Sequence, residues 1–156
     1  MSETPGDHPG VLIFPPLLFV ICVACGLVAH FGCPYRLALS PRIRGLGGGL
    51  ALGTIAFALW GQRSMKAAGT NVNPGLPALA IVAKGPFAFT RNPLYLSLIS
   101  LFTAIGIALA SPAFLAVLAP LCLVLHFGVV LREERYLEAK FGGTYRGYKA
   151  RVRRWI

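Results

Sequence analysis

Acidic residues are scarce in this sequence, which contains five Asp and Glu residues against 15 Lys and Arg. Charged residues of both signs make up 13% of the 156 residues, whereas soluble domains carry roughly 25%. Hydrophobic residues make up 56%, and a helix needs roughly 20 apolar residues to span a bilayer. The composition therefore excludes an ordinary soluble domain and predicts one all-α membrane domain over residues 1–156.

The sequence also lacks several motifs that would indicate other chemistry. Cys22-x-x-Cys25 has the spacing of a redox or metal site, but it lies in an apolar run with no second pair or His/Cys cluster beside it. We therefore expect no metal site, and we expect Cys22, Cys25, Cys33 and Cys122 to pack as small apolar residues. No Ser/His/Asp set or Walker sequence is present. No basic segment precedes the first apolar run, so we expect no cleaved signal peptide.

The net charge of +10 could indicate nucleic-acid binding. However, the basic residues lie in the predicted loops and the C-terminal tail, where positive charge sets membrane orientation and contacts anionic lipid. We therefore expect a membrane partner and no nucleic acid.

Four apolar runs predict four membrane-spanning helices. Residues 11–33 and 46–61 form two N-terminal spans within residues 11–61, and residues 94–110 and 113–131 form two more. Residues 1–10 are polar and are expected to be disordered. Only Ser111-Pro112 separates the last two spans, so they must form an antiparallel hairpin that brings Pro93 and Arg132 to the same membrane face.

Glycine recurs at Gly45, Gly49 and Gly53 in the second span. A phosphate-binding loop is one interpretation, but Leu and Ala flank these glycines and no Lys-Ser/Thr follows. A small-residue stripe that allows close contact between helices is the preferred interpretation.

The loops predict the orientation. The middle segment, residues 62–93, carries four basic residues and no acid, and the tail is also strongly basic. Both are expected on the cytoplasmic side, with both termini inside. The loop containing Arg36, Arg42 and Arg44 contradicts this simple rule. The absence of targeting signals and the low cysteine pairing indicate a bacterial-type inner membrane.

Residues 84–96 and Glu133-Glu134 are expected to form two walls of one site. Pro86 and Pro93 restrict the backbone, so residues 84–96 form a shaped loop that enters a helix near Pro93. An acidic pair at the end of a span is costly unless it is paired or binds a ligand. At least one of the two carboxylates is expected to bind a ligand such as an ammonium group. The alternative is neutralisation by Arg132 and Arg135 at the surface.

Other side chains near these walls are further candidates. Asn92 and Tyr95 can form hydrogen bonds beside the helix start, and Phe87 can stack on a planar ring or simply pack. His126 lies two helical turns before Glu133 on the same predicted face, as a proton acceptor or as a hydrogen-bonded residue of the bundle. After Gly142-Gly143, Tyr145, Tyr148, Val152 and Trp155 recur at three- and four-residue intervals among basic residues. This spacing predicts a basic interfacial helix that anchors to the membrane surface.

Three motifs resemble integral-membrane methyltransferases of the isoprenylcysteine carboxyl methyltransferase and phospholipid N-methyltransferase superfamily. They are Ala-Gly-Thr-Asn-Val-Asn-Pro (68–74), Gly-Pro-Phe-Ala-Phe-Thr-Arg-Asn-Pro-Leu-Tyr (85–95) and the stretch from Arg-Glu-Glu-Arg-Tyr to Arg-Val (132–152). Asn92-Pro93 is closer to the phospholipid enzymes than to the Arg-His-Pro of the carboxyl methyltransferases. Those carboxyl methyltransferases often have Tyr where this chain has Phe87, and they have an arginine where it has Val129.

The resemblance implies S-adenosylmethionine bound at the cytosolic face, in residues 62–156. Family cofactor positions correspond to Leu79, Ala80, Ile81, Val82, Phe87, Asn92, Pro93, Leu94, Tyr95 and Glu133. By the same reasoning, Arg132 or Arg135 orients an anionic lipid group, and Glu134 or His126 accepts a proton from an amine or hydroxyl acceptor. The expected activity is methyl transfer to a lipophilic acceptor. The alternatives are a sterol-reductase-like enzyme that uses NADPH and a non-catalytic lipid-binding or assembly protein.

Overall fold

The computed structural model describes residues 7–32 and 35–156, and it contains no β-strand in that part of the chain. The all-α prediction is therefore confirmed. The helical elements are α1 (Pro15–Gly32), α2 (Pro41–Ala67), the short 3₁₀ turn η1 (Gly85–Ala88), α3 (Pro93–Ala108), α4 (Pro112–Leu123), the π-helical segment η2 (Val124–Val130), α5 (Leu131–Phe141) and α6 (Gly143–Arg151).

Each of the helices α1 to α4 begins at a proline: Pro15, Pro41, Pro93 and Pro112. Proline is favoured at this position because the first N–H of a helix has no partner there and the ring presets φ. The predicted spans therefore sit in the right places but have different ends. The first helix starts at Pro15 instead of residue 11, and the second covers Pro41–Ala67 instead of 46–61.

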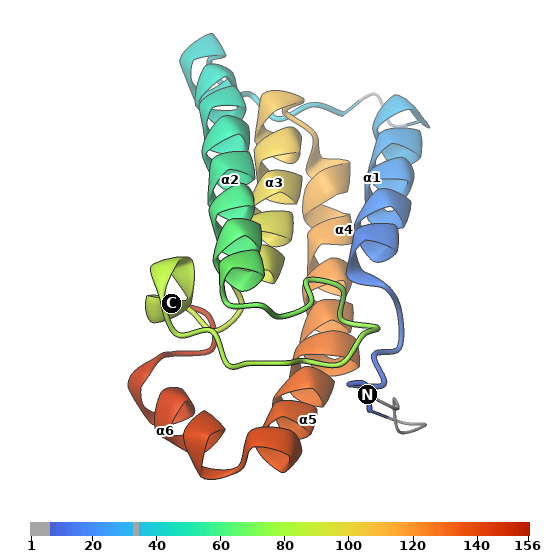
Figure 1. Ribbon diagram of the computed structural model, residues 1–156. Helices are drawn as coiled ribbons and strands as arrows, with labels where there is room; N and C mark the ends of the chain where they lie inside the picture. Colours follow the sequence, from blue (N-terminus) through green and yellow to red (C-terminus); the bar gives the residue numbers. More distant parts are fainter. Residues whose placement is uncertain (1–6, 33–34) are drawn as a thin grey trace.

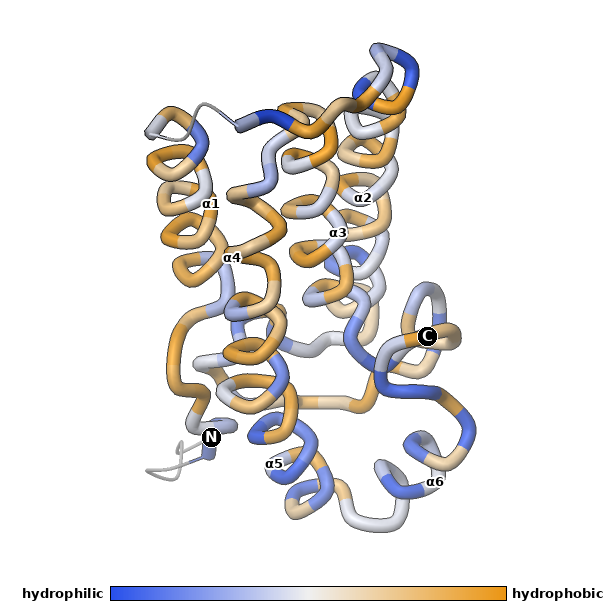
Figure 2. Tube along the Cα trace, turned by 180° about the vertical axis from the view of Figure 1, so that it is seen from behind, coloured by the Kyte–Doolittle hydropathy of each residue, from blue (hydrophilic) through white to orange (hydrophobic). Residues whose placement is uncertain are grey.

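Three helices are long and apolar enough to cross a membrane: α1, α2 and the continuous helix Pro112–Phe141, which joins α4, η2 and α5. The α3 helix is also apolar but has 16 residues. The four helices α1 to α4 stand side by side, and the α5 end of the long helix extends past the ends of the other three (Figure 1). The predicted span 113–131 is thus the first part of a longer helix. Colouring by hydropathy separates an apolar bundle from hydrophilic α5 and α6 (Figure 2).

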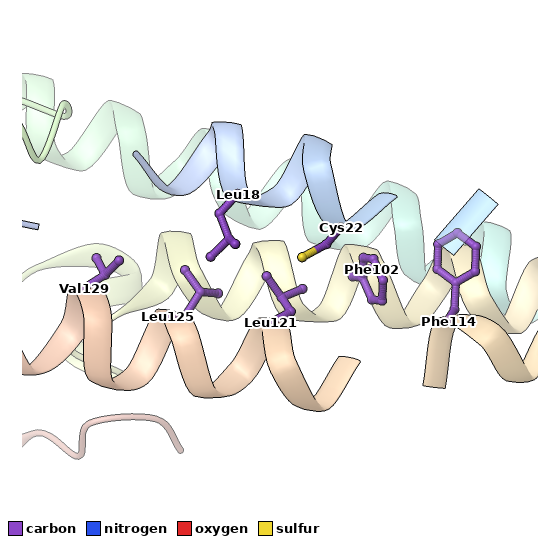
Figure 3. Close-up of a cluster of buried hydrophobic side chains, with 7 residues drawn as sticks. All are labelled: Leu18, Cys22, Phe102, Phe114, Leu121, Leu125 and Val129. Atoms are coloured by element: carbon purple, nitrogen blue, oxygen red, sulfur yellow. The ribbon is translucent and has the colours of Figure 1, made fainter. Parts of the chain in front are cut away.

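The core of the bundle lies between α1, α3 and the long helix. Its buried members line up along the helix axis in Figure 3 and are Leu18, Cys22, Phe102, Phe114, Leu121, Leu125 and Val129. Phe114 fits between two glycines, since a Cβ on Gly26 would lie 3.0 Å from its ring and one on Gly106 would lie 2.8 Å from its Cβ. These glycines let α1 and α3 approach α4 closely, which holds the predicted hairpin together.

The glycine stripe of α2 does not make the predicted contact. A Cβ on Gly45, Gly49 or Gly53 would meet no atom of the described chain within 4 Å. At Gly47 a Cβ would lie 2.8 Å from the Ala108 backbone nitrogen and 2.9 Å from the Ala104 carbonyl oxygen. The helix is rotated so that Gly47 faces α3, because the face that also contains Thr54 and Gly61 is the buried one.

The two ends of the chain also differ from the predictions. Residues 7–10 are not disordered: Asp7 accepts hydrogen bonds from Tyr136 Oη (2.7 Å) and Lys140 Nζ (2.6 Å). Residues 1–6 lie outside the described part. The C-terminal helix ends at Arg151, and Tyr145 and Tyr148 are buried against the protein itself, so its aromatic side is no membrane anchor.

The cysteines divide between packing and exposure. Cys22 is buried in the core, as predicted, and Cys122 is half-buried, but Cys25 is exposed on α1. Cys33 lies outside the described residues. Within residues 7–32 and 35–156, no group of three or more His, Cys, Asp or Glu side chains could hold a metal ion.

Candidate functional site

A cavity lies at the end of the bundle from which α5 extends. Its open volume is about 860 Å³, which includes solvent space at its mouth. Most of its wall comes from residues 70–82 of the middle segment, the start of α3 with the loop before it, the first turns of α5 and the buried side of α6, and Pro9 and Met65 complete the lining. These segments are distant in sequence and converge at the lower end of the bundle in Figure 1.

The hairpin brings its two arms together at one hydrogen bond. Tyr95, in the first turn of α3, donates through Oη to Glu133 Oε1 at 2.5 Å, and Glu133 lies in the first turn of α5. Both residues line the cavity. The expected convergence of residues 84–96 with Glu133-Glu134 is therefore what the structure contains. No basic side chain of the described residues forms an ion pair with Glu133.

The neighbouring Glu134 has a different environment. It is buried, with Arg91 Nη1 3.1 Å from Oε1, and Arg154 donates Nε to Oε1 at 2.9 Å and Nη2 to Oε2 at 2.8 Å. Bidentate pairs of this kind are among the strongest protein hydrogen bonds. The Nε and Nη1 atoms of Arg91 are buried and make no hydrogen bond within the described residues, so the contact of Nη1 with Glu134 is an ion pair only. Arg91 therefore keeps an unused donor beside the cavity.

Two tyrosines of α6 close the aromatic side of the cavity. Burial, with a contribution from Glu134, raises the pKa of the Tyr145 hydroxyl to about 12. Burial also raises the pKa of Tyr148, whose Oη donates to the Phe87 carbonyl oxygen at 2.8 Å. Both hydroxyls are therefore neutral near pH 7, and they can act as hydrogen-bond donors but not as bases.

The middle segment is held in shape by its own polar side chains. The Leu79 backbone N–H donates to Thr70 Oγ1 at 2.9 Å, and Asn71 Nδ2 donates to the Pro77 carbonyl oxygen at 2.8 Å. The Ala78 N–H donates to Tyr136 Oη at 3.1 Å, which ties the segment to α5. These bonds satisfy backbone groups that would pair with a neighbouring strand in a β-sheet, and they hold residues 80–82 at the cavity wall.

Comparison with known proteins gives one family. Residues 43–144 match the phospholipid methyltransferase family. The chain belongs to this family. An uncharacterised protein of Haemophilus influenzae is 44% identical over 64 residues, which are 40% of this chain and the whole of that protein. The predicted resemblance is confirmed, and family membership implies methyltransferase activity on lipid-related substrates by a protein of the membrane.

The cavity of this phospholipid methyltransferase family member contains most of the residues predicted for the site. Those that line it are Ala80, Ile81, Val82, Phe87, Asn92, Pro93, Leu94, Tyr95, Glu133 and Glu134. Four predicted residues do not line it: Leu79, His126, Arg132 and Arg135. Leu79 is 55% exposed. Arg132 and Arg135 instead border a shallow hollow beside Pro9 and Gly10, where Arg132 Nη1 donates to the Gly10 carbonyl oxygen.

His126 is displaced by the π-helical segment. Residues 124–130 use the wider i→i+5 turn, so counting 3.6 residues per turn from Glu133 back to His126 gives the wrong face. The His126 ring lies beside Trp155, with 6.2 Å between ring centroids. No sequence signal predicted the change of register.

Sequence reasoning missed several residues of the cavity. Arg91, Thr70, Asn71 and Tyr136 line it, as do Tyr145 and Tyr148, whose periodicity indicated an amphipathic helix but not which surface its aromatic side meets. The matched family region ends at residue 144. Tyr145, Tyr148 and Arg154 therefore extend the site beyond that region.

Proposed function

We propose that this protein transfers a methyl group from S-adenosylmethionine to a lipophilic acceptor in this cavity, at the cytoplasmic face of the membrane. The observation that carries the proposal is the half-buried carboxylate of Glu133, which accepts a hydrogen bond from Tyr95, has no basic partner among the described residues and lines a largely apolar, aromatic cavity. A carboxylate that is partly withdrawn from water without a cation is costly, and a cationic ligand would remove that cost.

The donor set fits both ends of the proposed cofactor. Glu133 is suited to an ammonium group, and the unused Nε donor of Arg91 is suited to a carboxylate. Phe87 and the apolar side chains of residues 80–82 are suited to packing against a planar ring. Asn92 and Tyr95 line the cavity at the start of α3, where Tyr95 donates to Glu133, and we expect both to fix the polar end of the cofactor.

When bound, S-adenosylmethionine would supply the methyl group of its sulfonium. The bond between this methyl group and sulfur would break as the acceptor forms its bond to the methyl group. The residues of the chain contribute positioning, which provides much of the acceleration of such a transfer, and exclusion of water from a step in which charge disperses. Glu134 is an unsuitable proton acceptor because both of its oxygens already accept from arginines. His126 does not line the cavity either. A proton from an amine or hydroxyl acceptor would therefore leave by another route, whereas a carboxylate acceptor has no proton to lose.

The charge distribution supports a cytoplasmic site. Residues 7–10, the middle segment and the basic tail lie at the cavity end of the bundle (Figure 1), and positive segments favour the cytoplasm. Arg36 and the first turn of α2, which contains Arg42 and Arg44, are at the other end, where Arg44 Nε donates to the Ala108 carbonyl oxygen at the end of α3. In this orientation α1 to α4 are the four spans, and the 16 residues of α3 reach about 24 Å at 1.5 Å per residue.

The proposal is tested by replacing the unpaired carboxylate. Glu133→Ala should weaken binding of S-adenosylmethionine at least roughly tenfold, because a lost charge-assisted hydrogen bond is worth about 1.5–3 kcal/mol. Isothermal titration calorimetry of the purified protein in nanodiscs measures this. Glu138→Ala is the matched control, since Glu138 is on the same helix and pairs with Lys149 at the surface (3.1 Å).

The same preparation separates the alternatives. Wild-type protein should bind S-adenosylmethionine and not NADPH, and should transfer labelled methyl groups to a species in a total lipid extract, identified by mass spectrometry. Binding of NADPH alone would support the reductase, and binding of neither would support the non-catalytic protein. Unchanged affinity in Glu133→Ala would remove the role of Glu133.

A further inference from the structure

The C-terminal segment after α6 runs back across the site. It begins at Val152, whose φ of −121° and ψ of 130° are extended, and we call residues 152–156 the C-terminal strap. The Arg91 backbone N–H donates to the Arg153 carbonyl oxygen at 3.0 Å. The next strap carbonyl, that of Arg154, accepts from Thr90 Oγ1 (3.1 Å) and Asn92 Nδ2 (2.9 Å). Two successive carbonyls thus hold three successive residues of the loop before α3.

The side chain of the same strap residue reaches the opposite wall. Arg154 holds both oxygens of Glu134, which is 6% exposed and belongs to α5. Because Arg91 also contacts Glu134, the strap, the loop and α5 meet at one carboxylate. Further along, Trp155 lies beside His126 in η2.

The residues that the strap holds are residues of the cavity wall. Arg91, Asn92 and Glu134 all line the cavity. The Asn92 amide donates to the strap and is therefore fixed in orientation, and the Arg91 guanidinium is directed by Glu134. The geometry of these groups depends on Arg154, which does not itself line the cavity.

We propose that Arg154 is a positioning residue of the site, which fixes the cavity-lining groups of the α3 loop relative to α5 through the buried Glu134 carboxylate. The inference rests on the proposed function for the ligand used to test it. In this proposal the Glu134 carboxylate forms the ion pairs that link the strap and the α3 loop to α5, and it does not take part in proton transfer. The strap lies outside the matched family region and contributes indirectly to ligand binding.

The matched pair Arg154→Gln and Arg153→Gln tests the proposal. Arg153 is the exposed neighbour, and only its backbone carbonyl is used by the loop. Arg154→Gln should weaken S-adenosylmethionine binding roughly tenfold, since it removes two charge-assisted hydrogen bonds, at unchanged stoichiometry in calorimetry. Arg153→Gln should bind within about twofold of the wild type. Arg154→Lys should fall between them, because a single ammonium cannot reproduce the bidentate fork.

Hydrogen–deuterium exchange of the ligand-free protein gives a second readout. Arg154→Gln should raise exchange at residues 90–92, where the strap accepts the Arg91 amide, and leave the α1 and α4 core protected. A purely structural role would instead lower the melting temperature and the fraction of binding-competent protein without changing the affinity of that fraction.

The outcomes distinguish the two proposals. If the wild type does not bind S-adenosylmethionine, the proposed function fails, and the exchange data alone decide whether the strap fixes the loop. If the wild type binds and Arg154→Gln matches it in affinity and exchange, the positioning role is refuted. Should Arg154→Gln not fold, Glu134→Gln and Arg154→Lys are judged by the same two measurements.

Discussion

Among the six glycines of α2, Gly47 is the one that meets the α3 backbone, whereas Gly61 meets the Leu94 side chain, and two alanine substitutions test the contact at Gly47. In Gly47→Ala the new Cβ would lie 2.8 Å from the Ala108 nitrogen and 2.9 Å from the Ala104 oxygen. Both are backbone atoms, so no side chain can rotate away. The helices would have to separate by about 0.6 Å or more to reach ordinary contact distances.

The magnitude follows from two opposing terms. Overpacking a close contact costs about 1–3 kcal/mol, whereas replacing glycine by alanine inside a helix gains about 1 kcal/mol. In Gly49→Ala only the gain applies, since its Cβ meets nothing within 4 Å. The two variants should therefore differ by about 1–3 kcal/mol in the free energy of unfolding, with Gly49→Ala the more stable.

Reversible unfolding in mixed detergent micelles, followed by circular dichroism, measures both variants under the same conditions. Equal stability of the two variants, or a larger loss in Gly49→Ala, would refute the assigned rotation of α2.

Two further predictions concern the loops of the site. Gly85→Ala should lower cofactor affinity and stability by about 1 kcal/mol or more, because the Gly85 φ is +62° and the new Cβ would lie 2.6 Å from Ser64 Oγ. Calorimetry and thermal unfolding measure the effect, and Gly75→Ala, at a residue whose φ is not left-handed, is the control. Wild-type behaviour of Gly85→Ala would count against this backbone geometry. Tyr136→Phe should raise hydrogen exchange at the Ala78 amide and weaken cofactor binding several-fold, because its hydroxyl accepts from Ala78 and donates to Asp7; unchanged exchange would show that the middle segment does not need this bond.

Local chemistry was sufficient to predict where the four apolar helices lie and that the last two form a hairpin, but not where the helices begin and end. Prolines occupy the first position of four helices, and their effect is local because it acts on one backbone N–H and one φ angle. The short Ser111-Pro112 link left only an antiparallel arrangement. From this alone, Tyr95 and Glu133 could be expected to lie near each other.

Tertiary packing decided the rotation of the helices and the partners of the charges. The π-helical turn at residues 124–130 moved His126 away from Glu133, although the sequence pattern there is an ordinary apolar run. The buried face of α2 contains Gly47 instead of the regular stripe, because contact with the α3 backbone selects one face among several apolar ones.

The sequence by itself determined a helical membrane protein with a loop and an acidic pair at the same end, because chain connectivity and apolar length act along the chain. It did not determine which acid pairs with which arginine. Glu134 forms ion pairs with Arg91 and Arg154 and not with its sequence neighbours Arg132 and Arg135. Glu133 accepts a hydrogen bond from Tyr95. Ion pairs are chosen by distance and burial in three dimensions, and only the folded chain brings its C-terminal strap to the carboxylate that the strap neutralises.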